Sequence, residues 1–260
     1  NITRTPGAHE REAAWSPDGT SIAYISDVTG ETELYIQYIA DGKTVQLTRN
    51  NDTYIQSFTW SPDAKKIVYT DRNNRLKMVD VASRQVTQLM QNPEGGTSRP
   101  QFSPDSKWLT YTRSASNDFR VVYLYNIASK KEYPVTDKWY SSSSPVFSTD
   151  GKYLIFSSNR NFEPEYGSLE WNHVYNNMGG IYMAMLAKDT PSPLLERDDE
   201  VNMAKKEEAS TTAGSSTTDI RIDPEGLNER LISLPLPGSY YGRFYCDGKK
   251  VYYYHRGSTK

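Results

Sequence analysis

One short phrase recurs along the chain at nearly constant spacing. It has five positions: an aromatic residue, then Ser, then either Pro or Thr, then Asp, and last a small residue. Its four copies are Trp15–Gly19, Trp60–Ala64, Phe102–Ser106 and Phe147–Gly151. The aromatic positions are separated by 45, 42 and 45 residues, and a weaker fifth copy, Phe244–Gly248, lies 97 residues after Phe147. Periods of about 40–50 residues are those of four-stranded propeller blades. The phrase therefore predicts an all-β chain of propeller blades.

The residues between the copies support this fold. A run rich in β-branched and aromatic residues follows each phrase: 22–25, 67–69, 108–111, 153–156 and 251–254. In the first four units a second run follows at 33–36, 76–79, 121–124 and 181–184. A polar turn and a closing run come next, as in 45–48, 86–89 and 133–136. Runs of this length bounded by turn residues indicate strands, and the residues leading into each aromatic supply the first strand of a four-stranded unit.

The repeated phrase itself predicts a tight turn between the first and second strands. Proline presets the backbone of the second position of a type I turn, and Asp and Gly suit the positions after it. The four repeated carboxylates are Asp18, Asp63, Asp105 and Asp150. A ring of metal ligands is one interpretation of them, but side chains of this type commonly cap their own turn. We therefore expect them to be structural.

The units predict four full blades and a partial fifth, at about 8–50, 51–92, 93–137, 138–237 and 238–260. Residues 2–7 resemble the end of a preceding blade. Because a propeller closes into a ring of four to eight blades, we expect the chain to be part of a longer protein. The alternative is that residues 1–7 close the last blade, which would give a five-bladed ring.

The fourth unit carries two insertions. Residues 160–179 separate its second and third strands, and residues 189–218 follow its third strand. The second insertion combines a charged run with a run of Ser, Thr, Ala and Gly, and such a composition buries too little apolar surface to offset the entropy of ordering. We therefore predict that 189–218 is mobile. The displaced fourth strand is expected near 230–234.

Composition excludes some classes of function. The net charge is −2 with no basic stripe, whereas nucleic-acid binding proteins show a basic excess, so no nucleic-acid partner is expected. No apolar run approaches the roughly 20 residues of a membrane-spanning helix. The single cysteine, Cys246, allows no internal disulfide. The 20 tyrosines fit half-buried strands and their edges.

No catalytic, metal-binding or phosphate-binding motif is visible, so no catalytic residue, metal or cofactor is predicted. The three histidines, His9, His173 and His255, lie in different units without ligand spacing. We interpret His9 as a solvated loop residue and His255 as a strand-end residue. The insertion 160–179 is the candidate binding loop, because aromatic residues on loops of a rigid scaffold are frequent contact anchors. Its candidate residues are Phe162, Tyr166, Trp171, His173 and Tyr175. Packing on its own blade or on a neighbouring domain is the alternative.

The repeat W-S-P-D-G-x-x-I-A-Y resembles the propeller repeats of TolB and of tricorn-type proteases. The opening T-R-T-P-G-A-H-E-R-E-A-A-W-S-P-D-G is similar to the start of the second, seven-bladed propeller of tricorn-like proteins. The later stretch I-D-P-E-G-L-N-E-R-L-I-S-L-P-L-P-G-S-Y-Y resembles the same region. The resemblance covers nearly the whole chain and is more specific in the later stretch.

The resemblance implies a non-catalytic propeller segment that guides or filters peptides towards a serine-protease core absent from this chain. It implies peptide or polypeptide substrates and the remaining domains of a parent protein as partners, and it leaves homo-oligomerisation through the parent open. The alternatives are a TolB-like interaction propeller of the cell envelope and the propeller of a prolyl-oligopeptidase-type enzyme. The compartment stays unknown, with a periplasmic or other exported location favoured over the cytoplasm.

Overall fold

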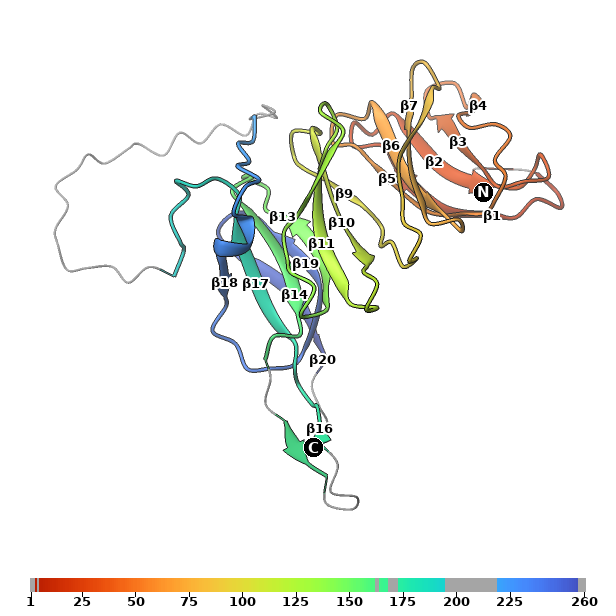
Figure 1. Ribbon diagram of the computed structural model, residues 1–260. Helices are drawn as coiled ribbons and strands as arrows, with labels where there is room; N and C mark the ends of the chain where they lie inside the picture. Colours follow the sequence, from red (N-terminus) through yellow and green to blue (C-terminus); the bar gives the residue numbers. More distant parts are fainter. Residues whose placement is uncertain (1–2, 4, 162–163, 168–172, 195–218, 257–260) are drawn as a thin grey trace, which may run out of the picture.

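The computed structural model describes residue 3 and residues 5–161, 164–167, 173–194 and 219–256. These residues form antiparallel sheets that follow one another in chain order (Figure 1). Blade 1 contains β1 (Glu10–Trp15), β2 (Ser21–Ser26), β3 (Glu33–Tyr38) and β4 (Thr44–Gln46). Blade 2 contains β5 (Ile55–Trp60), β6 (Lys66–Asp71), β7 (Arg75–Asp80) and β8 (Val86–Gln91). Blade 3 contains β9 (Gln101–Phe102), β10 (Trp108–Ser114), β11 (Arg120–Asn126) and β12 (Lys131–Pro134).

Blade 4 is interrupted, and blade 5 has two strands in the described part of the chain. Blade 4 contains β13 (Ser142–Phe147), β14 (Tyr153–Ser158), β17 (Gly180–Met185) and β18 (Leu231–Ser233), with the 3-10 helix η1 (Leu227–Glu229) before β18. The displaced fourth strand is therefore confirmed, because β18 pairs with β17. Blade 5 contains β19 (Tyr240–Cys246) and β20 (Val251–Arg256). Each of the five sheets lies within one of the five expected residue ranges.

The repeated phrase forms the expected turn, and its aspartates cap that turn. In the first copy the Ser16 hydroxyl donates to the Asp18 carboxylate (2.6 Å), which also accepts from the Thr20 amide (3.1 Å). The same two contacts recur at Asp63, Asp105 and Asp150. The last position of the phrase adopts a left-handed conformation, with φ of 71° at Gly19 and 56° at Ala64. The expected structural role of these carboxylates is thus confirmed.

The apolar core lies between consecutive blades. Four clusters of buried side chains join blade 1 to 2, 2 to 3, 3 to 4 and 4 to 5. Each middle sheet contributes one face to each of its two neighbours, as Val68 and Tyr69 of β6 show by packing into different clusters. The interface between blades 4 and 5 includes Tyr241, Phe244 and Cys246. Every blade is therefore stabilised by its neighbours, as the radial repetition of a propeller requires.

Strand pairing corrects the alignment of the fifth unit. Trp15, Trp60, Phe102 and Phe147 each pair with the residue seven positions later, but in blade 5 the residue that pairs at the turn is Cys246, opposite Val251. The loop is two residues shorter than in the other blades. Cys246, and not Phe244, therefore occupies the position of the repeated aromatic residue.

The five sheets follow one another in an open arc that begins with blade 1 at the right of Figure 1, and blade 5 packs against blade 4. The first strands of neighbouring blades meet on the inside of the arc, since β9 contacts β5, and β13 contacts both β9 and β19. Among the described residues before β1, Thr3 and Thr5 stay with blade 1, where they donate to the Glu10 carboxylate. None of the described residues before β1 forms a strand with blade 5, whose two described strands are β19 and β20.

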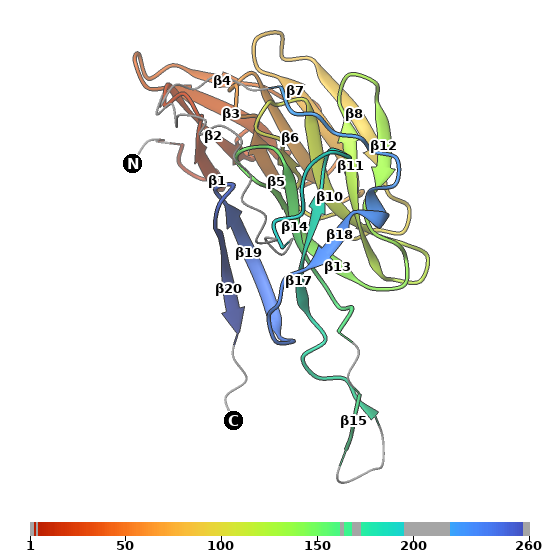
Figure 2. The same ribbon diagram turned by 90° about the vertical axis from the view of Figure 1, so that its left-hand side faces the viewer.

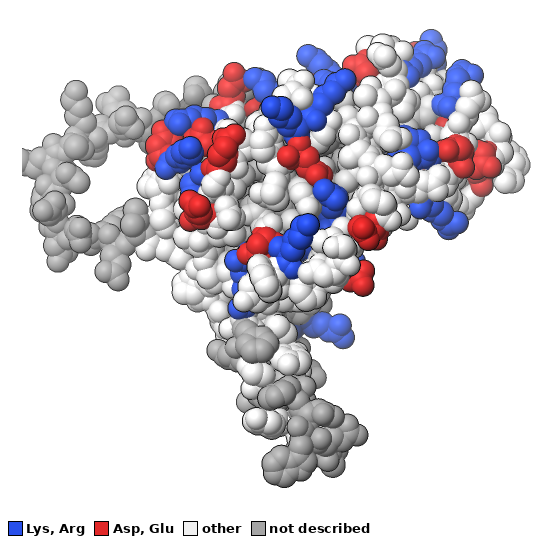
Figure 3. Space-filling view, in the orientation of Figure 1, with Lys and Arg blue, Asp and Glu red and all other residues white. Residues whose placement is uncertain are grey.

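The surface carries charges of both signs. On the face in Figure 3, Lys and Arg side chains alternate with Asp and Glu, and no large area is of one sign. None of the described helical segments is long and apolar enough to span a bilayer. The view turned by 90° shows the β19–β20 hairpin beside blade 4 (Figure 2).

Candidate functional site

The first insertion of blade 4 forms a hairpin that extends away from the arc. β14 and β17 pair directly, with Ser158 opposite Gly180, and the inserted residues continue this pair outward. Their outer part forms a second two-stranded sheet of β15 (Glu165–Tyr166) and β16 (His173–Val174). Figure 1 shows this sheet projecting below the body of the molecule. The described part of the insertion is thus an arm that projects from blade 4.

The predicted binding residues are distributed along this arm. The Tyr166 and Tyr175 side chains are 73% and 54% exposed. The backbone of Tyr166 lies opposite that of His173 in the β15–β16 pair. Phe162 and Trp171 lie outside the described residues. Tyr166, His173 and Tyr175 therefore belong to one hairpin. That these residues take part in binding stays a prediction.

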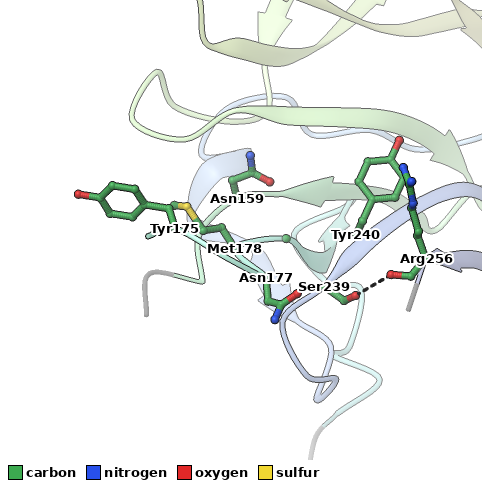
Figure 4. A pocket seen from close by; sticks show the side chains of 8 residues that line it. Asn159, Tyr175, Asn177, Met178, Ser239, Tyr240 and Arg256 are labelled. Atoms are coloured by element: carbon green, nitrogen blue, oxygen red, sulfur yellow. Dashed lines mark hydrogen bonds between the residues drawn. The ribbon is translucent and has the colours of Figure 1, made fainter. Parts of the chain in front are cut away.

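A hollow of about 360 Å³ lies at the base of the arm, where it meets the chain entering β19. It is lined by Asn159, Tyr175, Asn177, Met178, Gly179, Ser239, Tyr240 and Arg256. Figure 4 shows Tyr175 extending from one side, with Tyr240 and Arg256 on the other. The Ser239 amide donates to the Gly179 carbonyl (2.8 Å), so the base of the arm is tied to blade 5.

A serine and a histidine meet beside this hollow. The Ser239 hydroxyl lies 2.8 Å from Nε2 of His255, and the imidazole stacks on Tyr241 at 5.3 Å between ring centroids. Burial raises the pKa of the Tyr241 hydroxyl, which donates to the Pro237 carbonyl (2.5 Å). A catalytic Ser–His pair needs a carboxylate that orients the imidazole. Within the described part of the chain, His255 makes no hydrogen bond to an Asp or Glu, so this pair is suited to joining β19 to β20.

The described residues contain no group of three or more His, Cys, Asp and Glu side chains placed to hold a metal ion. His9 lies in the loop before β1, where its amide donates to Asp27, and His255 lies one residue before the end of β20. Burial raises the pKa of the Cys246 thiol, which is 2% exposed and packs between blades 4 and 5. The histidine and cysteine residues of the described chain therefore form no reactive cluster.

The innermost strands carry a set of residues that sequence reasoning missed. β1, β13 and β19 each contain a bulge in which one residue adopts a left-handed conformation: Glu12 (φ 57°), Ser144 (φ 55°) and Arg243 (φ 53°). Each stands three positions before the residue that occupies the repeated aromatic position, Trp15, Phe147 and Cys246. Aligning the fifth unit on Cys246 would have revealed this periodic position, which projects to the inside of the arc.

Radially repeated four-stranded antiparallel sheets with their first strands on the inside define this chain as a segment of a β-propeller. The chain belongs to the tricorn protease second β-propeller domain family, because the sequence model of that family matches residues 1–260. This match confirms the resemblance seen in the repeat and in the stretch after the second insertion.

Individual relatives agree with this family. Tricorn protease homolog 1 of Streptomyces coelicolor is 27% identical over 250 residues, which covers 93% of this chain and 23% of that protein. The tricorn protease of Thermoplasma volcanium is 26% identical over 196 residues, which covers 73% of this chain and 18% of that protein. The crystal structure of the tricorn protease superposes with a TM-score of 0.75 at 17% identity over 91% of this chain and 22% of that chain. This chain thus spans between 18% and 23% of the length of these relatives.

Proposed function

We propose that this chain is a non-catalytic propeller segment of a tricorn-like serine protease, and that its inner surface guides peptides towards a catalytic domain outside this chain. The family match over residues 1–260 carries the proposal. The polar, bulged inner strands support it, because an extended peptide needs backbone and side-chain hydrogen-bond partners along its path. On this proposal the chain alone hydrolyses no peptide.

The test is to obstruct the inner surface of the intact parent protein. Gln56 is exposed on β5, an innermost strand, and Ala82 is exposed on the outer turn between β7 and β8. Gln56→Cys and Ala82→Cys, each labelled with the same bulky maleimide, place one group inside and one outside the arc. The native Cys246 is buried and stays unlabelled.

We expect the label at position 56 to slow hydrolysis of a long unfolded polypeptide severalfold, because the path narrows while the catalytic groups are untouched. The label at position 82 should leave the rate unchanged. Hydrolysis by the parent that is equally insensitive to both labels would show that substrates do not pass this surface.

We further propose that the arm formed by residues 160–179 is a contact element for another domain of the parent or for a polypeptide. Its exposed Tyr166 and Tyr175 and its projection from the body support this role. Replacing residues 162–176 with Gly-Gly keeps the β14–β17 pair. We expect the shortened parent to keep its folded propeller but to lose affinity for its partner domain, measured by co-purification of separately expressed parts. Undiminished co-purification would contradict this role.

A further inference from the structure

A second hollow, of about 440 Å³, opens on the inside of the arc between blades 3, 4 and 5. It exists because β9 has two residues whereas β5 and β13 have six. The chain before β9 leaves the ladder and is held to β10 by Asn92, which donates to the Ser114 carbonyl (3.3 Å), and by Ser98. The Ser98 amide donates to the Thr112 carbonyl, and the Ser98 hydroxyl accepts from the Thr112 amide (both 2.8 Å). Thr112 on β10 therefore lines the hollow, with both of its backbone groups paired to Ser98.

Three arginines border this hollow: Arg99, Arg120 and Arg243. Arg99 is paired with Glu12, across the inside of the arc. The Arg120 and Arg243 guanidinium groups have no ion pair or hydrogen bond with any described residue, and no Asp or Glu lines the hollow. In a chain whose net charge is −2, two unpaired cations at one site are a local excess of positive charge.

One of these two arginines, Arg243, has an unfavourable backbone conformation. Arg243 is held in the left-handed conformation of the β19 bulge (φ 53°), which is unfavourable for a residue other than glycine. Bulges re-aim side chains and occur often beside functional sites. Arg243 also lines a further hollow with Tyr240 and Tyr254, so this one residue borders two hollows. This placement makes the guanidinium available to a ligand that lies along the inner strands.

A buried hydroxyl points to the same kind of ligand. Thr112 lines the hollow and is 1% exposed, and its side-chain oxygen has no hydrogen-bond partner among the described residues. Buried hydroxyls are normally paired, so an unpaired one calls for an explanation. Guanidinium and hydroxyl donors together suit an oxyanion. Beside them Pro145, Val146 and Phe244 form an apolar wall, which suits a carboxylate with a hydrocarbon part.

We propose that this hollow is a carboxylate-binding subsite for extended peptides. Arg120 and Arg243 bind the carboxylate, Thr112 donates its hydroxyl to it, and the apolar wall packs on the adjacent side chain. The proposal rests on the proposed passage of peptides along the inner surface and adds a preference for acidic ones. The carboxylate belongs either to a Glu or Asp side chain or to the free C-terminus, which share the same chemistry.

The test compares short fluorescent peptides that are identical except for one central Glu or Gln, each with a free or an amidated C-terminus. Binding is measured by anisotropy with the full chain. The key variant is Arg243→Asn, because Asn tolerates the left-handed conformation. Arg84→Asn is the matched control, since Arg84 has φ of 59° in the exposed turn between β7 and β8. Thr112→Val removes only the hydroxyl.

We expect Arg243→Asn to weaken binding of the carboxylate-bearing peptide roughly tenfold, as for loss of a charge-assisted hydrogen bond, and Thr112→Val to weaken it less. Arg84→Asn should change nothing. Comparing the Glu with the Gln peptides, and the free with the amidated C-termini, shows whether a side-chain carboxylate or the C-terminal carboxylate is bound. Equal affinity for all four peptides, or equal effects of the two Asn variants, would overturn the subsite and leave the proposed function standing. Failure of every peptide to bind would overturn both.

Discussion

Replacing Arg230 with alanine is expected to lower the free energy of unfolding by about 3 kcal/mol. Its guanidinium donates to four backbone carbonyls: Met185 (3.1 Å), Glu225 (2.9 Å), Leu186 (3.4 Å) and Asp223. These bonds fix the chain that returns from the second insertion against the end of β17. Without the guanidinium these carbonyls lose their partner, and β18 loses its anchor. Urea denaturation followed by tryptophan fluorescence measures the change.

Arg221 provides the matched control in the same segment. Its side chain is 62% exposed and forms ion pairs with Asp189 (2.7 Å) and Asp223 (3.1 Å). Exposed ion pairs contribute between about 0 and 1 kcal/mol, so Arg221→Ala should leave the urea midpoint nearly unchanged. Arg230→Lys keeps the charge but cannot reach four carbonyls, and it should fall between the two. Equal losses in Arg221→Ala and Arg230→Ala would contradict the anchoring role of Arg230.

The blade architecture was predictable because its determinants are local. The hydrogen bonds that form the turn of the first copy join Ser16, Asp18 and Thr20, residues close together in the chain. Each turn therefore forms in the same way wherever the phrase occurs. The strands on either side then pair as neighbours, which needs no knowledge of distant parts of the chain.

The fifth unit shows where this reasoning fails. The aromatic pattern places Phe244 at the repeated position. The pairing of Cys246 with Val251 shows instead that Cys246 occupies this position and that Phe244 lies two residues before it. A shorter turn, closed by Asp247 accepting from the Lys249 and Lys250 amides, replaces the repeated phrase. The pattern of residue types cannot distinguish these registers, because Phe244 and Cys246 both face blade 4. Both registers bury the same apolar residues.

The inner hollow was not predictable for a different reason. Its residues come from three blades, and the pair of Arg99 with Glu12 joins residues 87 positions apart. Such contacts depend on the angle between blades and on the shortness of β9, neither of which has a local signature. The arm at 160–179 was found from sequence because an insertion is visible as a break in the period, whereas its tie to Ser239 depends on how blade 5 docks.

That tie leads to the second large effect: Gly179→Ala is expected to destabilise the chain by roughly 2–3 kcal/mol. A Cβ at Gly179 would collide with the Ser239 carbonyl oxygen, and one at Gly238 would collide with the Asn177 carbonyl oxygen. Both obstacles are backbone atoms, which cannot rotate aside as a flexible side chain can. The added methyl group must therefore push the entry to β19 away from the base of the arm.

Gly242→Ala is the control, because it lies in β19 itself and a Cβ there meets only the Ser144 hydroxyl, at 4.0 Å. Removing a glycine where space is free reduces the entropy of the unfolded chain. This variant should therefore be as stable as the unsubstituted chain or slightly more stable. Thermal unfolding of the two variants separates the cases. If Gly179→Ala and Gly242→Ala melted together, the close contact between Gly179 and Ser239 would not be holding the arm to blade 5, and the hollow between them would have no fixed shape.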